Sequence, residues 1–256
     1  MPSISDAVIL MAGAGSRLGK PGGALAKPLV RIAGRPLVCY ALDAFERAGV
    51  RNVHVVLGAN SERLAAEMNA LLPEAMTLHP IINADWRKQN GVSVLSAEGK
   101  VRAPFFLTMG DHLFEFPILE RLLAQGDRAR VNLAIDRKIE TIFDLDDAMK
   151  VRTDGERILA ISKELEEYDA IDTGVFLCSE SIFSYLKSAL RDGDCSLSDG
   201  VRLLAADGEM RAIDIGDAWW QDIDTPEMLQ RAVAESARLL RQSGSRLAQE
   251  RVASES

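Results

Sequence analysis

The sequence of 256 residues predicts an α/β protein with a Rossmann-like, mixed but mainly parallel sheet that carries helices on both faces. In the first half, short apolar runs that end in glycine or polar turns alternate with segments of helical periodicity. The first run is continuously apolar, which is typical of a parallel strand buried on both faces. The second half is less regular, and we expect the sheet to become mixed there.

The first half is expected to begin with a β-α-β unit followed by a further helix and strand. In chain order, the predicted elements are a strand at Ala7–Met11, a helix at Pro36–Ala48, a strand at Val53–Leu57, a helix at Glu62–Leu72 and a strand at Phe105–Met109. Gly49 ends the first helix, because glycine at the end of a helix permits the chain to turn away.

The second half is expected to add shorter strands and a final helix. The predicted elements are strands at Val131–Asp136, Met149–Arg152 and Val175–Cys178, a turn at Asp154-Gly155, a helix at Glu180–Lys187 and an amphipathic helix at Thr225–Arg241. Residues 1–241 are therefore expected to form one domain. The polar segment 242–256 is expected to be a disordered tail.

Composition excludes several classes of function. The net charge of −8 and the isoelectric point near 5.1 offer no electrostatic attraction to nucleic acid or to an anionic membrane. No apolar run approaches the length of about 18 residues that would span a bilayer, so we expect no membrane insertion and a cytoplasmic location. The three cysteines are widely separated, which favours neither a disulfide framework nor a CxxC metal site. An anionic ligand must therefore be held by a few placed cations and backbone amides.

A glycine-rich segment, Leu10–Gly19, begins at the end of the first predicted strand and is followed by Lys27-Pro28. Glycines at such a turn allow backbone amides to approach phosphate oxygens closely. Arg17 and Lys27 bring positive charge to the same place. The segment therefore predicts a site for a triphosphate.

Two known phosphate-binding patterns do not fit this segment. A dinucleotide-binding turn requires G-x-G-x-x-G and an acidic residue after the second strand, whereas here the spacing is G-x-G-x-x-x-G and the second strand is followed by Gly58-Ala59-Asn60. The P-loop spacing is also absent, and Lys20 precedes Pro21. A glycine turn with a purely structural role remains as the alternative.

Acidic residues stand at two places where ligands of an α/β sheet are expected. Asp111 follows the apolar strand Phe105–Met109, while Asp222 and Asp224 lie in the segment Trp219–Pro226. Magnesium usually takes one or two carboxylates together with phosphate oxygens, so Asp111 and Asp224 are candidates to share one Mg²⁺. Each of them alone could instead cap a helix, Asp224 in particular because a predicted helix begins just after it.

Together these segments resemble the sugar-phosphate nucleotidyltransferases. Leu10–Gly19 with Lys27-Pro28 resembles the glycine-rich signature of that family, although Met11 stands where alanine is more usual. Four later segments resemble the inositol-1-phosphate cytidylyltransferase branch in the same order: Asn90–Ser93, Leu107–His112, Ile171–Phe176 and Trp220–Thr225. The resemblance covers roughly residues 6–235. It implies the nucleotide-diphospho-sugar transferase type of fold.

The resemblance also implies a role for individual residues. The nucleotide would be bound by Ala12, Gly13, Ala14, Gly15, Ser16, Arg17, Lys27, Asn90, Gly91 and Ser93, and Mg²⁺ by Asp111 and Asp224. The phosphorylated acceptor would be bound by Asp136, Lys163, Asp172 and Thr173. Arg17, Lys27 and Lys163 would be the catalytic cations. His112 is left open between a ligand contact and a structural hydrogen bond.

The reaction implied by the resemblance is transfer of CMP from CTP to inositol 1-phosphate, which gives CDP-inositol and pyrophosphate. Other acceptors remain open, namely a hexose 1-phosphate, phosphocholine or the molybdenum cofactor. A non-catalytic nucleotide-binding module is a further alternative. In some relatives of this branch the cytidylyltransferase is fused to a membrane-embedded transferase, so the resemblance implies a functional link to such an enzyme on a separate chain.

Overall fold

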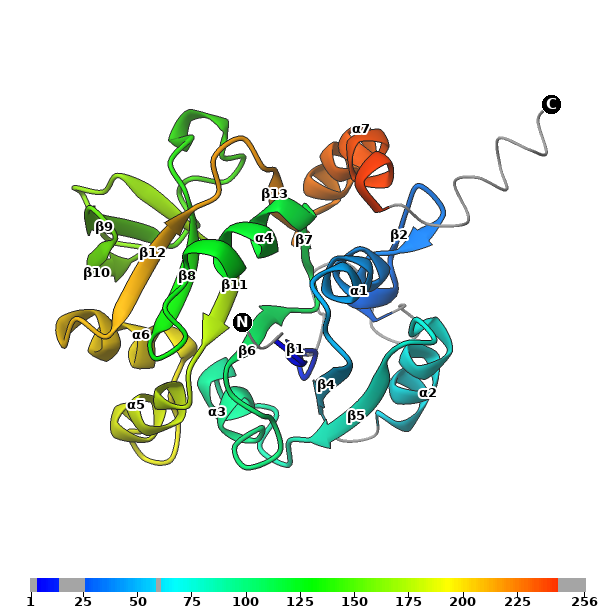
Figure 1. Ribbon diagram of the computed structural model, residues 1–256, viewed down its shortest axis with the longest axis horizontal. Helices are drawn as coiled ribbons and strands as arrows, with labels where there is room; N and C mark the ends of the chain where they lie inside the picture. The colour runs from blue at the N-terminus through cyan, green and yellow to red at the C-terminus, as the bar shows by residue number, and fades with distance from the viewer. Residues whose placement is uncertain (1–3, 14–25, 59–60, 244–256) are drawn as a thin grey trace.

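The computed structural model describes residues 4–13, 26–58 and 61–243. These residues form a nine-stranded mixed sheet with helices on both faces (Figure 1). The strands of this sheet are β1 (Asp6–Leu10), β4 (Asn52–Leu57), β5 (Thr77–Ile82), β6 (Phe105–Met109), β8 (Val131–Asp136), β9 (Lys150–Asp154), β10 (Arg157–Ser162), β11 (Ala170–Cys178) and β12 (Met210–Asp214). Two small ladders pair β2 (Arg31–Ile32) with β3 (Arg35–Pro36), and β7 (His112–Phe114) with β13 (Trp220–Asp222).

The helices are α1 (Val38–Arg47), α2 (Glu62–Leu71), α3 (Asn90–Leu95), α4 (Phe116–Gln125), α5 (Ser181–Ala189), α6 (Leu197–Ala206) and α7 (Pro226–Ser243), with 3₁₀ turns η1 (Lys27–Leu29) and η2 (Ile139–Thr141). α7 is amphipathic and packs its apolar side against the β2–β3 hairpin and α1, where Ala232 meets Ile32 and Tyr40 in one buried cluster. Within the described residues, no helix combines the length and the apolar character that a membrane span requires.

The strand order is β5-β4-β1-β6-β11-β8-β12-β10-β9. β1 runs parallel to both β4 and β6, whereas β11 runs antiparallel to both β6 and β8. The start of β11 therefore lies at the same edge of the sheet as the ends of β6 and β8. That edge carries the functional side chains described below.

Alternation along the strands builds one hydrophobic layer on each face of the sheet. Val8 and Leu10 of β1 pack with α3, α5 and α6 on one face, while Ala7 and Ile9 pack with α1, α2 and α4 on the other. Figure 1 shows these two groups of helices on opposite sides of the sheet. Burial on both faces explains why the strand is a continuous apolar run.

The predicted α/β architecture with a mixed second half is confirmed, and several boundaries differ. The final helix continues to Ser243, two residues beyond the predicted end of the domain, and residues 244–256 lie outside the described part. β11 begins at Ala170, five residues before its predicted start at Val175, because Asp172, Thr173 and Gly174 interrupt the apolar pattern. Six of the longer elements, α3, β5, α4, β10, α6 and β12, were not predicted, and neither were the short strands β2, β3, β7 and β13.

Candidate active site

Two adjoining cavities open at the edge of the sheet where β1, β6 and β8 end. The smaller cavity, of about 380 Å³, contacts the ends of β1 and β6 together with η1. The larger cavity, of about 720 Å³, is bounded by β11, β13, α7 and the segment after β8. Asn90, Met109 and Asp224 line both cavities, so a ligand in one would lie next to a ligand in the other.

The smaller cavity contains the described part of the glycine-rich segment. Ala12 and Gly13 line it, as does Lys27 from η1. The chain is held there by hydrogen bonds from the backbone N–H of Met11 to Val56 (2.8 Å) and from Gly110 to Leu10 (2.9 Å). The predicted nucleotide-binding residues Ala14, Gly15, Ser16 and Arg17 lie outside the described residues.

Lys27 lies between the two predicted metal ligands. Its ammonium donates to Asp111 Oδ2 at 3.0 Å and also to Asp224 Oδ1. The Nδ1 of His112 lies 2.8 Å from the other carboxylate oxygen of Asp111. Burial alone would lower the pKa of Lys27, but the charges and hydrogen bonds of Asp111 and Asp224 raise it above its ordinary value.

The ionisable groups around Asp111 shift one another's pKa values. Burial alone would raise the pKa of Asp111, yet the hydrogen bond and charge of His112 and the charge of Lys27 hold it well below its usual range. Burial would lower the pKa of His112, but Asp111 raises it, assisted by Asp222 and Asp172. Burial and the charges of Asp224 and Asp111 raise the pKa of Asp222. The carboxylates of Asp111 and Asp224 thus already have the Lys27 ammonium and the His112 ring beside them, and an added cation would compete with Lys27.

Short backbone contacts bring Asp111 and Asp224 together although they lie far apart in the sequence. The N–H of Ile223 donates to the carbonyl of Asp111 at 2.9 Å, and Asp222 pairs with His112 across the β7–β13 ladder. One oxygen of each carboxylate accepts a hydrogen bond from the Lys27 ammonium, so the two carboxylates lie close together. Within residues 4–13, 26–58 and 61–243, no three His, Cys, Asp or Glu side chains form a metal cage. Two carboxylates completed by phosphate oxygens are a donor set that suits Mg²⁺.

The segment expected beside the base is held by contacts of its own. Asn90 Oδ1 accepts from the N–H of Leu197 at the start of α6 (2.8 Å), and Ser93 Oγ accepts from Asn83 (3.0 Å). A Cβ on Gly91 would lie 2.6 Å from the carbonyl oxygen of Cys195, so the close approach of α3 to α6 requires glycine there. Asn90 and Ser93 line the smaller cavity, whereas Gly91 has this packing role.

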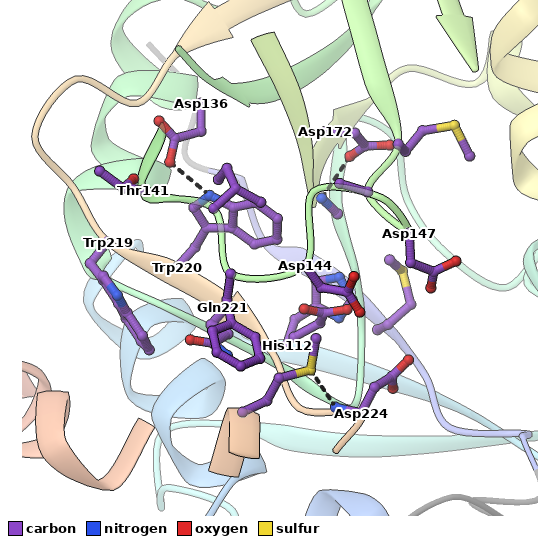
Figure 2. A pocket seen from close by; sticks show the side chains of 18 of the residues that line it. His112, Asp136, Thr141, Asp144, Asp147, Asp172, Trp219, Trp220, Gln221 and Asp224 are labelled. Carbon is purple, nitrogen blue, oxygen red and sulfur yellow. Dashed lines mark hydrogen bonds between the residues drawn. The ribbon is translucent and has the colours of Figure 1, made fainter. Parts of the chain in front are cut away.

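Three of the four predicted acceptor-binding residues line the larger cavity. Two of them, Asp136 and Asp172, are labelled in Figure 2. Lys163 forms an ion pair with Asp147 across the cavity rim. Asp172 accepts from the N–H of Gly174 at 2.6 Å. Asp136 is buried and accepts from Trp220 Nε1 at 3.0 Å and from the backbone N–H of Lys138 at 2.8 Å. Its carboxylate therefore orders the cavity wall.

Thr173 does not face the larger cavity, contrary to the expectation from the sequence. Its side chain is fully buried and its hydroxyl donates to the carbonyl of Ala134 at 2.8 Å. Side chains alternate between the two faces of a strand, so Asp172 and Thr173 point to opposite sides of β11. Asp172 alone of this pair is available to an acceptor.

Residues 7–196 match the family model described as the MobA-like NTP transferase domain. The chain belongs to this family. The matched segment includes the described part of the glycine-rich turn, Lys27, Asp111 and Asp172, while Asp224 follows it in the chain.

Relatives of this NTP transferase domain include larger enzymes. The bifunctional IPC transferase and DIPP synthase of Thermococcus kodakarensis is 34% identical over 88% of this chain and 49% of that protein. The protein of the same name from Aquifex aeolicus is 31% identical over 90% of this chain and 51% of that protein. The chain thus spans about half the length of these curated relatives.

A solved structure supports the same assignment of fold. The inositol-1-phosphate CTP transferase from T. maritima superposes with a TM-score of 0.80 at 26% identity, covering 91% of this chain and 98% of that one. The expected nucleotide-diphospho-sugar transferase fold of the domain is therefore confirmed.

Several residues of the site were not predicted. His112 makes the structural hydrogen bond to Asp111 that the sequence left undecided, and its ring stacks on Trp220 with centroids 6.5 Å apart. Asp144 and Asp147 line the larger cavity from the irregular segment after β8. Gly174 has φ +70°, and a Cβ there would lie 2.3 Å from His112 Nε2. The residues Asp172-Thr173-Gly174, which interrupt the apolar pattern of the strand, were the only local signal in the sequence.

Gly174→Ala is expected to destabilise this NTP transferase domain by about 2 kcal/mol or more, because it combines left-handed backbone strain with a clash against His112. Gly155→Ala is the matched control: its φ is +58°, and no described atom lies within 4 Å of its added Cβ. That control is expected to cost about 1 kcal/mol. Urea unfolding measures both values, and equal losses in the two variants would contradict the clash.

Asp172→Asn is expected to stabilise the protein at pH 8 by about 1 to 3 kcal/mol. Burial raises the pKa of Asp172 to about 6. As the pH falls, the carboxyl therefore takes up its proton at a higher pH in the folded than in the unfolded protein. Above about pH 6 the ionised carboxylate opposes folding. This penalty disappears as the pH falls towards about 4, the pKa of the carboxyl in the unfolded chain. The gain in melting temperature should vanish over the same range.

Asp169→Asn provides a control of opposite sign for that measurement. Burial opposes the shift, but Thr153 and Arg137 lower the pKa of Asp169, so its ionised form stabilises the fold above its unfolded pKa. Asp169→Asn should therefore lower the melting temperature at pH 8, with the difference shrinking as the pH falls below about 4. A melting temperature of Asp172→Asn that does not depend on pH would contradict the raised pKa.

Proposed function

We propose that the chain is a Mg²⁺-dependent cytidylyltransferase that joins CTP to inositol 1-phosphate and releases pyrophosphate. The observation that carries this proposal is the convergence of Asp111, Asp224 and Lys27 where the two cavities adjoin. The smaller cavity would take the nucleotide and the larger one the acceptor. The names of the relatives from T. kodakarensis and T. maritima support this choice of substrates.

The reaction requires two anions to meet. A phosphate oxygen of the acceptor attacks the α-phosphorus of CTP, a new P–O bond forms, and the bond to the bridging oxygen of the leaving pyrophosphate breaks. The attacking phosphate is already anionic, so no side chain has to remove a proton. The chain's contribution is therefore to bring the reactants together and to offset their charge.

The positive charge would come from two sources. Asp111 and Asp224 would hold Mg²⁺ with phosphate oxygens, and the ion would neutralise charge on the triphosphate. Lys27 would then donate to the α-phosphate, since its ammonium already lies beside both carboxylates. Arg17, which lies outside the described residues, remains a predicted second cation for the triphosphate.

The acceptor would be recognised from the larger cavity. Lys163 would release its ion pair with Asp147 and bind the acceptor phosphate instead. Asp172 would accept hydrogen bonds from polyol hydroxyls. Trp219 and Trp220 also line this cavity, and aromatic faces bind quaternary ammonium groups. Phosphocholine is therefore the alternative acceptor that the structure favours. The link to a separate membrane-embedded transferase remains a prediction.

The test is a matrix of pyrophosphate-release rates. CTP, UTP, GTP, ATP and dTTP are each combined with inositol 1-phosphate, glucose 1-phosphate and phosphocholine, with Mg²⁺ or with EDTA. We expect the CTP and inositol 1-phosphate pair to be fastest and the reaction to stop in EDTA. A faster reaction with another acceptor would replace the substrate but keep the reaction class. Absence of release in every combination would favour a non-catalytic binding module.

A further inference from the structure

One wall of the larger cavity is an irregular segment, here called the acceptor wall, which comprises residues 139–147. Thr141, Phe143, Asp144 and Asp147 of this wall all line the cavity. The wall has only the short turn η2 as regular structure, and Phe143 is 49% exposed. Burial contributes little to its position, so specific contacts must fix it.

The acceptor wall is fixed at its two ends by lysines. Just before the wall, the Nζ of Lys138 donates to the carbonyl of Gly216 at 2.5 Å and pairs with Asp136 at 2.8 Å. Near its far end, Asp147 pairs with Lys163. The middle of the wall, which includes Thr141 and Phe143, depends on another contact.

That contact comes from Arg231 in the second turn of α7. Arg231 Nη2 donates to the carbonyl of Thr141 at 2.9 Å, and the guanidinium carbon lies 5.6 Å from the centroid of the Phe143 ring. Stacking on an aromatic ring while donating to a carbonyl in a second direction suits a planar guanidinium. Arg231 itself lines the larger cavity.

The charge of Arg231 distinguishes it from the two lysines. Lys138 and Lys163 each pair with a carboxylate, whereas no carboxylate pairs with Arg231 in the described part of the chain. Its partners are the backbone carbonyl of Thr141 and the ring of Phe143, and both belong to the acceptor wall. Arg231 also lies beyond residue 196, where the match to the family model ends.

We propose that Arg231 is a positioning residue that sets acceptor specificity by holding the acceptor wall in place. This inference rests on the proposed function. The wall carries Asp144 and Asp147, so its position decides where two carboxylates meet the hydroxyls of the acceptor. It also decides where Asp147 holds Lys163 before the acceptor phosphate arrives. A displaced wall widens the cavity and favours small, flexible acceptors over a ring polyol.

The first test is kinetic. Arg231→Ala is expected to raise KM for inositol 1-phosphate roughly tenfold, since one hydrogen bond and one cation–π contact are lost. The kcat and the KM for CTP should hardly change, and the preference for inositol 1-phosphate over glycerol 3-phosphate should shrink. Arg231→Lys should not restore that preference, because an ammonium lacks the planar fork. Gln230→Ala, an exposed neighbour on the same helix, is the matched control.

A double-mutant cycle assigns the effect to the wall. Phe143→Ala should raise KM for inositol 1-phosphate in the same direction, and adding it to Arg231→Ala should produce less than the sum of the two effects. Because Phe143 is half exposed, this variant also keeps the test open if Arg231→Ala folds poorly. Fully additive effects would overturn the proposed coupling.

The second test needs no substrate. Hydrogen-exchange mass spectrometry of the free protein should show faster exchange of peptides within 139–147 in Arg231→Ala than in the wild type or in Gln230→Ala. Faster exchange with an unchanged acceptor preference would overturn the specificity role, and unchanged exchange would overturn the positioning role. If the wild type uses no phosphorylated acceptor, the proposed function fails and the inference about specificity fails with it. The exchange result still decides whether Arg231 holds the wall.

Discussion

Asp111→Asn is expected to lower the turnover number by about a hundredfold or more while the protein stays folded. Each carboxylate oxygen of Asp111 has its own partner, His112 at Oδ1 and Lys27 at Oδ2. The amide keeps one acceptor oxygen but loses the negative charge and turns an N–H donor towards one of these two partners. The loss should therefore fall on charge stabilisation at the triphosphate.

Initial rates of pyrophosphate release at saturating CTP and acceptor, measured over a range of Mg²⁺ concentrations, give the result for Asp111→Asn. Asp43→Asn is the control, because that carboxylate pairs with Arg35 away from both cavities. The control should keep the wild-type rate. Recovery of the full rate by Asp111→Asn at high Mg²⁺ would mean that the other ligands hold the ion without Asp111.

Lys27→Met is expected to produce two effects of opposite direction. The rate should fall by about a hundredfold, because the ammonium that would meet the growing charge at the α-phosphate is lost. Binding of a divalent ion without nucleotide should instead tighten, on the order of tenfold. In the free protein the ammonium pairs with both carboxylates, and an entering ion must compete with it.

Manganese titration followed by electron paramagnetic resonance measures this ion affinity directly, without turnover. Lys88→Met is the matched control, since Lys88 forms an exposed pair with Asp85. It should change neither the affinity nor the rate. An unchanged manganese affinity in Lys27→Met would show that the lysine and the ion do not compete for Asp111 and Asp224.

Strands that are buried on both faces were predictable, because they are continuous apolar runs. β6 and β8 have the bounds that were predicted, and β4 begins one residue earlier. β5 was missed because it is an edge strand that contains Pro80 and in which Ile81 is the single buried residue. The start of β11 was missed because Asp172 and Gly174 there contribute to the cavity and to the space for His112. The residues that interrupt the apolar pattern of β11 thus belong to the candidate site.

Only the site residues that belong to motifs at the ends of strands could be predicted from the sequence. Asp111 follows β6, so its place at the sheet edge follows from topology. The contact between Lys27 and Asp224 joins residues 197 positions apart, and the pair of Lys163 with Asp147 depends on an irregular segment. Arg231 was missed because a lone arginine on an amphipathic helix has no distinguishing pattern. Such pairings arise from tertiary packing alone.

The place of β12 in the sheet affects how far the protein could be shortened. β12 lies between β8 and β10, although it follows residue 196, where the family match ends. A fragment cut at that residue would lose an interior strand, leaving the facing backbone groups of both neighbours unpaired. Exposed strand edges of this kind recruit other chains. Such a fragment should therefore aggregate on expression, and a transplantable version of the domain must retain β12.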